Sequence, residues 1–139
     1  MKTQFTFTSD AFAPRPGELD EAHDDYINPG LYALELADFL VAGLAGKGFE
    51  VGFRCQEDWG HWMELVHDGG YTLGLGCSNT ESTVGGKPEH RVFVTPDKPV
   101  IRKLFRKIDV RADVERLVDA LGRLLAESPQ VDGVTLEAP

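Results

Sequence analysis

Two runs of alternating apolar residues in the middle of the chain limit most strongly what it can fold into. They consist of Val51, Phe53 and Cys55 in the first run, and Tyr71, Leu73, Leu75 and Cys77 in the second. A period of two places successive side chains on opposite faces of a β-strand. Residues 61–67 lie between the runs, with turn-forming sequences at 57–60 and 68–70 on either side. The middle of the chain is therefore predicted to form an antiparallel meander.

Two further elements are predicted before the meander. Phe5 and Phe7 alternate with polar residues, which predicts a half-buried strand over 4–8. A long polar loop follows. Asn28 before Pro29 is typical of a helix start, because asparagine caps helices and proline at the first helical position loses no hydrogen bond. Apolar residues then recur at helical spacing, which predicts a helix over 30–46.

After the meander, the pattern predicts a loop, two strands and two helices. The polar residues 78–89 lack periodicity and are predicted to be an exposed loop, followed by a short strand over 91–95. Apolar residues recur at helical spacing over 99–108 and again over 114–125, which predicts two helices. A last edge strand is expected over 131–136.

Together these elements describe an α+β fold with a single antiparallel sheet, a meander of about four to six strands, and two or three helices packed on one face. The length is that of an average domain, so residues 1–139 are expected to form a single domain. Two cysteines are too few for a disulfide framework, and no secretory leader or membrane-spanning run is evident. We therefore expect a cytoplasmic protein without a cofactor.

Charge is divided unevenly along the chain. Residues 1–68 hold 13 acidic and 4 basic residues, residues 69–139 hold 10 of each, and the whole chain carries −9. This balance argues against binding of nucleic acid or anionic membrane by the surface as a whole. Six bases nevertheless lie close together in the second half: Lys98, Arg102, Lys103, Arg106, Lys107 and Arg111.

Most of these bases lie in the predicted helix 99–108. Four apolar residues share one face of that helix: Ile101, Leu104, Phe105 and Ile108. The bases then occupy the opposite side, where we expect them to be solvated or paired with acids of this chain or of a second copy. Binding of a phosphate-bearing ligand is an alternative. If the apolar face packs in the core, little is left to insert into a membrane, and Phe105→Ala should lower the free energy of unfolding by about 3–5 kcal/mol.

The meander also predicts a candidate metal site. A three-residue turn at 68–70 sets His61 opposite Cys77, and a five-residue connection at 56–60 sets Cys55 beside His61. Two cysteines and a histidine are a ligand set typical of zinc. No CxxC pair supports the site, and cysteine is often a small core residue, so packing is the favoured interpretation.

The turn between the first two strands of the meander carries candidate catalytic residues. Glu57 and Asp58 precede His61 in the sequence, next to Trp59 and Trp62. A carboxyl group packed against indole rings has a raised pKa and can act as a general acid. The simpler alternative is a turn in which Asp58 caps the backbone and Trp59 covers the end of the sheet.

Gly74 and Gly76 lie in a sequence that superficially suggests a phosphate-binding loop. Such a loop joins a strand to a helix, whereas here a polar loop and another strand are predicted to follow. We therefore interpret the two glycines as positions where another group packs closely on the sheet.

Three short motifs resemble those of a loose family of small uncharacterised bacterial proteins. They are the Asn-Pro-Gly helix start at 28–30, the Glu-Asp-Trp-Gly turn at 57–60 and the Gly-Cys-Ser-Asn strand end at 76–79. His61 and Ser78 depart from the family pattern. The resemblance implies a bacterial origin and a single domain, and it implies no reaction. Size and acidity are also similar to those of immunity proteins of bacterial toxin systems.

We therefore expect a non-enzymatic protein-binding module, immunity- or inhibitor-like, that engages a basic protein. The expected partner-binding residues combine negative charge with aromatic side chains: Asp24, Asp25, Glu57, Asp58, Trp59 and Trp62. One alternative is a small enzyme that uses Glu57, Asp58 and His61. A weaker alternative is a metal- or ligand-binding domain at Cys55, His61 and Cys77. Neither nucleic acid nor a membrane is expected as a partner.

Overall fold

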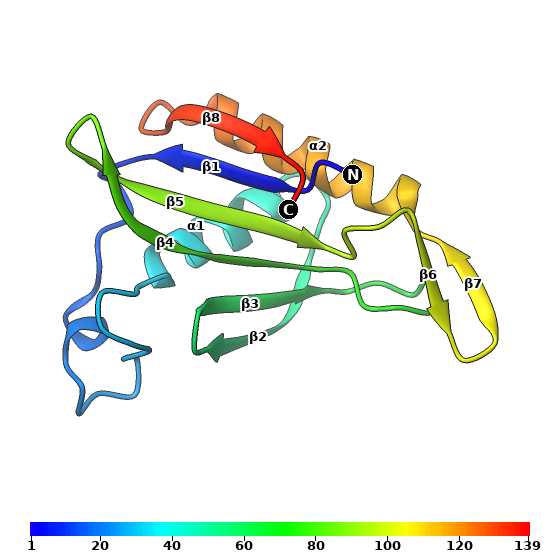
Figure 1. Ribbon diagram of the computed structural model, residues 1–139, viewed down its shortest axis with the longest axis horizontal. Helices are drawn as coiled ribbons and strands as arrows, with labels where there is room; N and C mark the ends of the chain where they lie inside the picture. The colour runs from blue at the N-terminus through cyan, green and yellow to red at the C-terminus, as the bar shows by residue number, and fades with distance from the viewer.

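The computed structural model describes residues 1–139 and contains a six-stranded antiparallel sheet, a separate two-stranded hairpin and two α-helices (Figure 1). The sheet has the order β2-β3-β4-β5-β1-β8. Its strands are β1 (Gln4–Thr8), β2 (Val51–Glu57), β3 (Gly60–Leu65), β4 (Gly74–Val84), β5 (Lys87–Thr95) and β8 (Asp132–Glu137). The hairpin consists of β6 (Val100–Lys103) and β7 (Arg106–Asp109), and the helices are α1 (Leu34–Ala45) and α2 (Arg111–Glu127). The predicted α+β class is confirmed. Of the two or three helices expected, the structure has two, and the expected single sheet is accompanied by a separate two-stranded one.

Both helices pack on one face of the sheet and leave the other face uncovered. In Figure 1 the strands of the sheet lie in front of α1 and α2. Alternate residues of the strands point to the helices, and Phe5, Phe7, Met63 and Leu75 are each at most 2 % exposed. They belong to one cluster of 23 buried apolar residues. Antiparallel sheets tolerate such one-sided burial, because every second side chain faces water.

Neither α1 nor α2 is long and apolar enough to cross a membrane.

The predicted register between β3 and β4 is confirmed. His61 lies opposite Cys77, and Met63 lies opposite Leu75. The pairing sets apolar side chains against each other on the buried face, which is why the sequence could predict it. The last edge strand is confirmed as well, since β8 pairs with β1 at the edge of the sheet.

The predicted register between β2 and β3 is wrong by one residue. Glu57 pairs with Gly60, so the connection has two residues rather than five. Cys55 therefore lies opposite Trp62 instead of beside His61. A two-residue turn allows more residue pairs between the strands than a five-residue connection does. Because the register shifts by one residue, Cys55 and His61 point to opposite faces of the sheet.

The predicted loop over 78–89 is also wrong. β4 continues to Val84 and β5 begins at Lys87, so the segment is a long hairpin. Gly85 and Gly86 have φ values of 62° and 79°, which suit the tight turn between two twisted strands. Ser78 and Asn79 are still buried, whereas residues 81–84 are exposed, so backbone pairing rather than apolar burial holds the outer part of the hairpin.

The predicted helix over 99–108 is a hairpin instead, formed by β6 and β7. Ile101 and Ile108 lie opposite each other and pack against the core. Leu104 and Phe105 form the turn and are 92 % and 103 % exposed. A spacing of seven residues brings two side chains together on a helix face, and it also does so across a two-residue hairpin turn. The apolar spacing therefore fits both structures, and in the hairpin only Ile101 and Ile108 are partly buried.

The first helix begins later than predicted. α1 starts at Leu34, and residues 28–30 form a turn in which the Leu31 N–H donates to the Asn28 carbonyl. Asn28 therefore does not cap the helix. The preceding loop contains a short 3-10 helix (Pro16–Leu19), whose Glu18 takes over that role, as described below.

The position of Phe105 reverses the expected result of a core substitution. Phe105→Ala should change the free energy of unfolding by less than about 0.5 kcal/mol, because the side chain loses no buried contacts. Leu121→Ala, at a fully buried position of α2, should lower it by about 2–5 kcal/mol. Urea unfolding curves of both variants measure the difference, and a large loss for Phe105→Ala would restore the helix interpretation.

Candidate functional site

A loop and a turn come together at one end of the sheet. Asn28 donates a hydrogen bond from Nδ2 to the backbone oxygen of Asp58 (2.6 Å), and Gln56 donates from Nε2 to the backbone oxygen of Tyr26 (2.8 Å). These bonds hold the loop against the β2–β3 turn. Four of the expected partner-binding residues lie in or next to these segments and are referred to as the acidic end: Asp24, Asp25, Glu57 and Asp58. The structure thus brings together acids that are about thirty residues apart in sequence.

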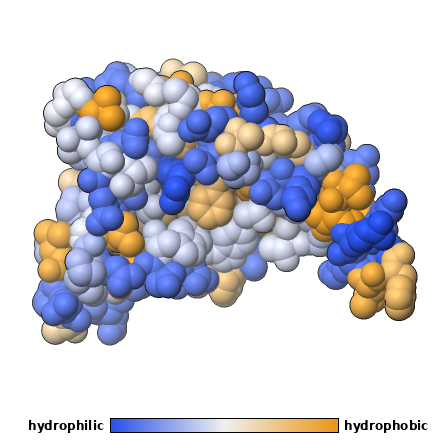
Figure 2. Space-filling model, in the orientation of Figure 1, coloured by the Kyte–Doolittle hydropathy of each residue, from blue (hydrophilic) through white to orange (hydrophobic).

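An aromatic patch of Trp59, Trp62 and Phe93 lies near the acidic end, on the uncovered face of the sheet. The ring centroids of Trp59 and Phe93 are 5.2 Å apart. A methyl group at Gly76 would collide with both of these rings, and one at Gly74 would collide with the Trp62 ring. The predicted role of the two glycines is therefore confirmed. Figure 2 shows this face, with less hydrophilic atoms near its centre and hydrophilic ones around them.

The candidate catalytic residues do not converge. His61 lies opposite the buried Cys77 and therefore points to the helix-covered face, where it is 8 % exposed. Glu57, the next residue along β2, points to the uncovered face and accepts a hydrogen bond from Cys55 Sγ (3.4 Å). Asp58 lies exposed in the turn between them. General acid–base catalysis by these residues would require their side chains to meet in one pocket, which they do not.

The candidate metal ligands are separated in the same way. Cys55 lies on the uncovered face, whereas His61 and Cys77 face the helices. No group of three His, Cys, Asp or Glu side chains is close enough to hold a metal ion. Burial raises the pKa of the Cys77 thiol well above its ordinary value, so this sulfur stays protonated. Cys77 contributes to packing in the core.

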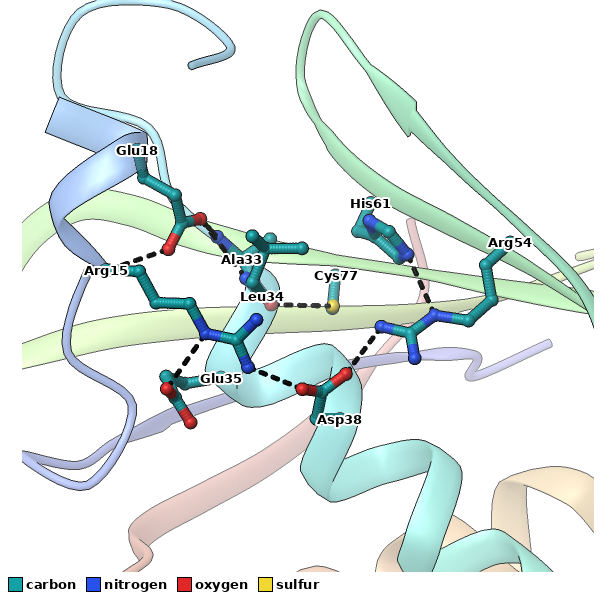
Figure 3. A network of polar contacts seen from close by, with 9 residues as sticks. All are labelled: Arg15, Glu18, Ala33, Leu34, Glu35, Asp38, Arg54, His61 and Cys77. Atoms are coloured by element: carbon teal, nitrogen blue, oxygen red, sulfur yellow. Dashed lines mark hydrogen bonds and ion pairs between the residues drawn. The ribbon is translucent and has the colours of Figure 1, made fainter. Parts of the chain in front are cut away.

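Sequence reasoning missed Glu18, which organises the loop before α1. Its carboxylate is 2 % exposed and accepts hydrogen bonds from the backbone N–H groups of Arg15 (2.9 Å), Ala33 (2.8 Å) and Leu34 (3.2 Å) (Figure 3). The last two groups are at the start of α1, where unpaired N–H groups favour a negative charge. The sequence signal that could have identified it is a glutamate three residues after the N-cap residue Arg15, with Pro16 at the first helical position.

Ion pairs continue from Glu18 to the sheet (Figure 3). Arg15 donates to Glu35 (2.9 Å) and to Asp38, and Asp38 also accepts from Arg54 (2.8 Å). Burial raises the pKa of Asp38, but hydrogen bonds from the two arginines outweigh it, and the net pKa is lowered. Arg54 in turn donates from Nε to Nε2 of His61 (3.1 Å). The network joins the loop, α1 and β2, and so holds the acidic end in place.

The largest groove lies away from all of these residues. It has a volume of about 430 Å³ and lies between the end of α1, the β3–β4 loop and α2. Its charged and titratable lining residues are Lys47, His67, Arg116, Asp119 and Arg123. None of the residues expected from the sequence to bind a partner lines this groove.

The Glu18 cap leads to a stability prediction. Glu18→Ala should lower the free energy of unfolding by roughly 2–4 kcal/mol, because buried N–H groups at the start of α1 lose their acceptor. Glu21→Ala, at an exposed position of the same loop, is the matched control and should change it by less than about 0.5 kcal/mol. Urea unfolding measures both. Equal stability of the two variants would contradict the capping role.

Two buried histidines lead to a pH prediction. Burial lowers the pKa of His61 and of His90, so both are neutral in the folded protein at pH 7. The unfolded chain binds their protons more readily, so protonation favours unfolding and stability falls as the pH drops below about 6.5. Urea unfolding at several pH values should show this slope. The double variant His61→Gln with His90→Gln should flatten it, and an unchanged slope would assign the effect to other groups.

Comparison with known proteins adds no relative. No family model matches the chain, and neither a curated protein nor a solved structure matches it. The residues described above are therefore the basis for any functional conclusion.

Proposed function

We propose that this protein is a non-enzymatic protein-binding module that binds a basic protein through the acidic end and the aromatic patch. The observation that carries the proposal is the contact between the loop and the β2–β3 turn, made by Asn28 with Asp58 and by Gln56 with Tyr26. It holds the loop of Asp24 and Asp25 against the β2–β3 turn, from which the aromatic patch extends over the uncovered face. Protein interfaces commonly combine aromatic anchors with complementary charge.

The arrangement also fits what such a surface has to do. Acids on exposed segments attract a basic partner over a distance and speed up its encounter. The rings of Trp59 and Trp62 lie against glycines, which restricts their motion before binding. Side chains that are already ordered lose less entropy when they become buried in a complex. An inhibitor-like or immunity-like role in the cytoplasm agrees with these features.

The enzyme alternative lacks such support. Glu57 and His61 lie on opposite faces of the sheet, and the nitrogen of His61 that would accept a proton is occupied by Arg54. The acidic end also disfavours nucleic acid as a partner, because phosphates and carboxylates repel each other.

The binding proposal is tested by removing charge from the acidic end. Asp24→Asn with Asp58→Asn should weaken binding of the basic partner at least about tenfold at low salt, since both acids are exposed. The partner is obtained by capture on the immobilised protein at low salt, purified, and titrated against each variant by calorimetry. Trp62→Ala should weaken binding by about 2 kcal/mol or more if this ring is an anchor.

The control removes equal charge elsewhere. Glu115→Gln with Asp119→Asn changes two exposed residues of α2 and should leave the affinity within about twofold of the parent. Failure to recover a stoichiometric partner at low salt, or equal loss of affinity in both double variants, would overturn the proposal.

A further inference from the structure

The β6–β7 hairpin projects from the end of the molecule opposite the acidic end (Figure 1). Its base is attached to the body by Ile101 and Ile108, which pack against the core, and by the Val110 N–H, which donates to the Pro99 carbonyl. The outer half of the hairpin, from Arg102 to Lys107, is exposed throughout. This outer half takes no part in the acidic end or the aromatic patch.

The tip of the hairpin is apolar and fully exposed. Leu104 and Phe105 are 92 % and 103 % exposed and are the most exposed large apolar residues of the chain. Leu104 also has a φ of 57°, in the left-handed region where glycine is preferred. The turn thus carries a bulky apolar side chain at a position where the backbone alone favours glycine. Such a departure from local preference is typical of a functional position.

Four cations surround this tip. Lys103 pairs with Arg106 directly below the turn, and Arg102 pairs with Lys107 one step farther. Successive pairs of a two-stranded ribbon point to opposite faces, so two cations lie on each face. At about 3.3 Å per residue, all four are within roughly 7 Å of the tip along the strands. The cations therefore form a ring around the tip rather than a stripe along one side.

No acid neutralises the ring. Arg102, Arg106 and Lys107 form no ion pair, and Lys103 donates only to the carbonyl of Gly70 (3.0 Å). Of the two arrangements expected for these bases, solvation rather than pairing with acids of the same chain is the one present. The acidic end lies at the other end of the long axis, so salt largely screens its charge from the tip.

We propose that the hairpin binds the surface of an anionic phospholipid bilayer, with Leu104 and Phe105 entering the boundary of the hydrocarbon and the cation ring contacting phosphate and carboxylate headgroups. When the hairpin enters the bilayer with its tip first, Leu104 and Phe105 reach the edge of the hydrocarbon. The cations just behind the tip then lie at the level of the lipid headgroups. A bilayer surface that surrounds the inserted tip contacts both faces of the hairpin at once. Cations on both faces can therefore bind headgroups together. The strands β6 and β7 are four residues long, so the apolar tip and all four cations reach the same interface.

This inference concerns adsorption and requires no membrane-spanning helix. The sequence argued against adsorption because the apolar residues of 99–108 were expected to pack in the core. In the structure only Ile101 and Ile108 do so, which leaves the tip residues free. A short apolar tip gives weak, reversible binding by itself, and a polybasic ring is the kind of second signal that strengthens it.

The test is sedimentation of the full chain with vesicles of phosphatidylcholine, with and without phosphatidylserine. We expect binding to the vesicles that contain phosphatidylserine, and its loss at about 1 M salt. The stem variant Arg102→Gln with Lys107→Gln should lower the vesicle partition coefficient roughly 25-fold, because each cation removed lowers it about fivefold. The tip variant Leu104→Gly with Phe105→Ser should lower the partition coefficient at least about tenfold, because it removes the apolar side chains of the tip. Glycine favours the positive φ at position 104, so we expect the variant to keep the hairpin.

Matched controls change the same kind of residue elsewhere. Lys2→Gln with Arg123→Gln removes two exposed cations without an ion pair, and Val84→Ser removes an exposed apolar residue from another hairpin. Both should bind the vesicles like the parent. Circular dichroism melts confirm that each variant is folded.

Several outcomes would overturn the proposal. They are absence of binding to phosphatidylserine vesicles at low salt, equal binding by the tip variant and the parent, and equal loss in the control variants. Binding of a DNA duplex or of polyglutamate that depends on Arg102 and Lys107, without binding to vesicles, would assign the hairpin to a different polyanion. The acidic end is unchanged in all these variants, so their result is independent of the proposed protein partner.

Discussion

The register of β2, β3 and β4 decides which side chains reach the helices and which reach the uncovered face. In a sheet, neighbouring residues alternate between faces, so a change of one residue in one turn exchanges the two sets. The two-residue turn at Asp58 and Trp59 therefore sends His61 into the core and Glu57 to the outer face. Burial of an apolar set on one side is what makes this register stable, and the aromatic patch on the other side is its consequence.

A buried carboxylate makes the rest of the acidic end possible. Glu18 satisfies N–H groups at the start of α1, and the ion pairs of Arg15 and Arg54 extend from there to His61. A long polar loop would otherwise lose little free energy by moving, since it contains few apolar residues to bury. Because the loop is held at several points, its acids stay next to the β2–β3 turn. The contacts of Glu18, Arg15 and Arg54 thus stabilise the acidic end, although none of these residues belongs to it.

The molecule separates its charges along its length. The segments that carry the acidic end lie at one end of the sheet, and the β6–β7 hairpin, which carries the cation ring, extends from the other (Figure 1). Since salt screens charge over about 10 Å, the two ends act on their surroundings independently. The two proposed contacts, with a basic protein at one end and an anionic surface at the other, are therefore compatible in one molecule.

The sequence by itself determined the elements whose signal is local. Alternation predicted the strands of the meander, apolar pairing predicted the β3–β4 register, and the periodicity of Val114 to Leu125 predicted α2. The partner-binding role of the acids and tryptophans also comes from the sequence, and it stays a prediction. Only the tertiary structure decided the length of the β2–β3 turn, the choice of hairpin over helix at 99–108, and the burial of Glu18. The physical reason is that each depends on contacts between distant residues: a spacing of seven fits a helix and a hairpin equally, and a loop glutamate is buried only where a helix start supplies N–H groups to receive it.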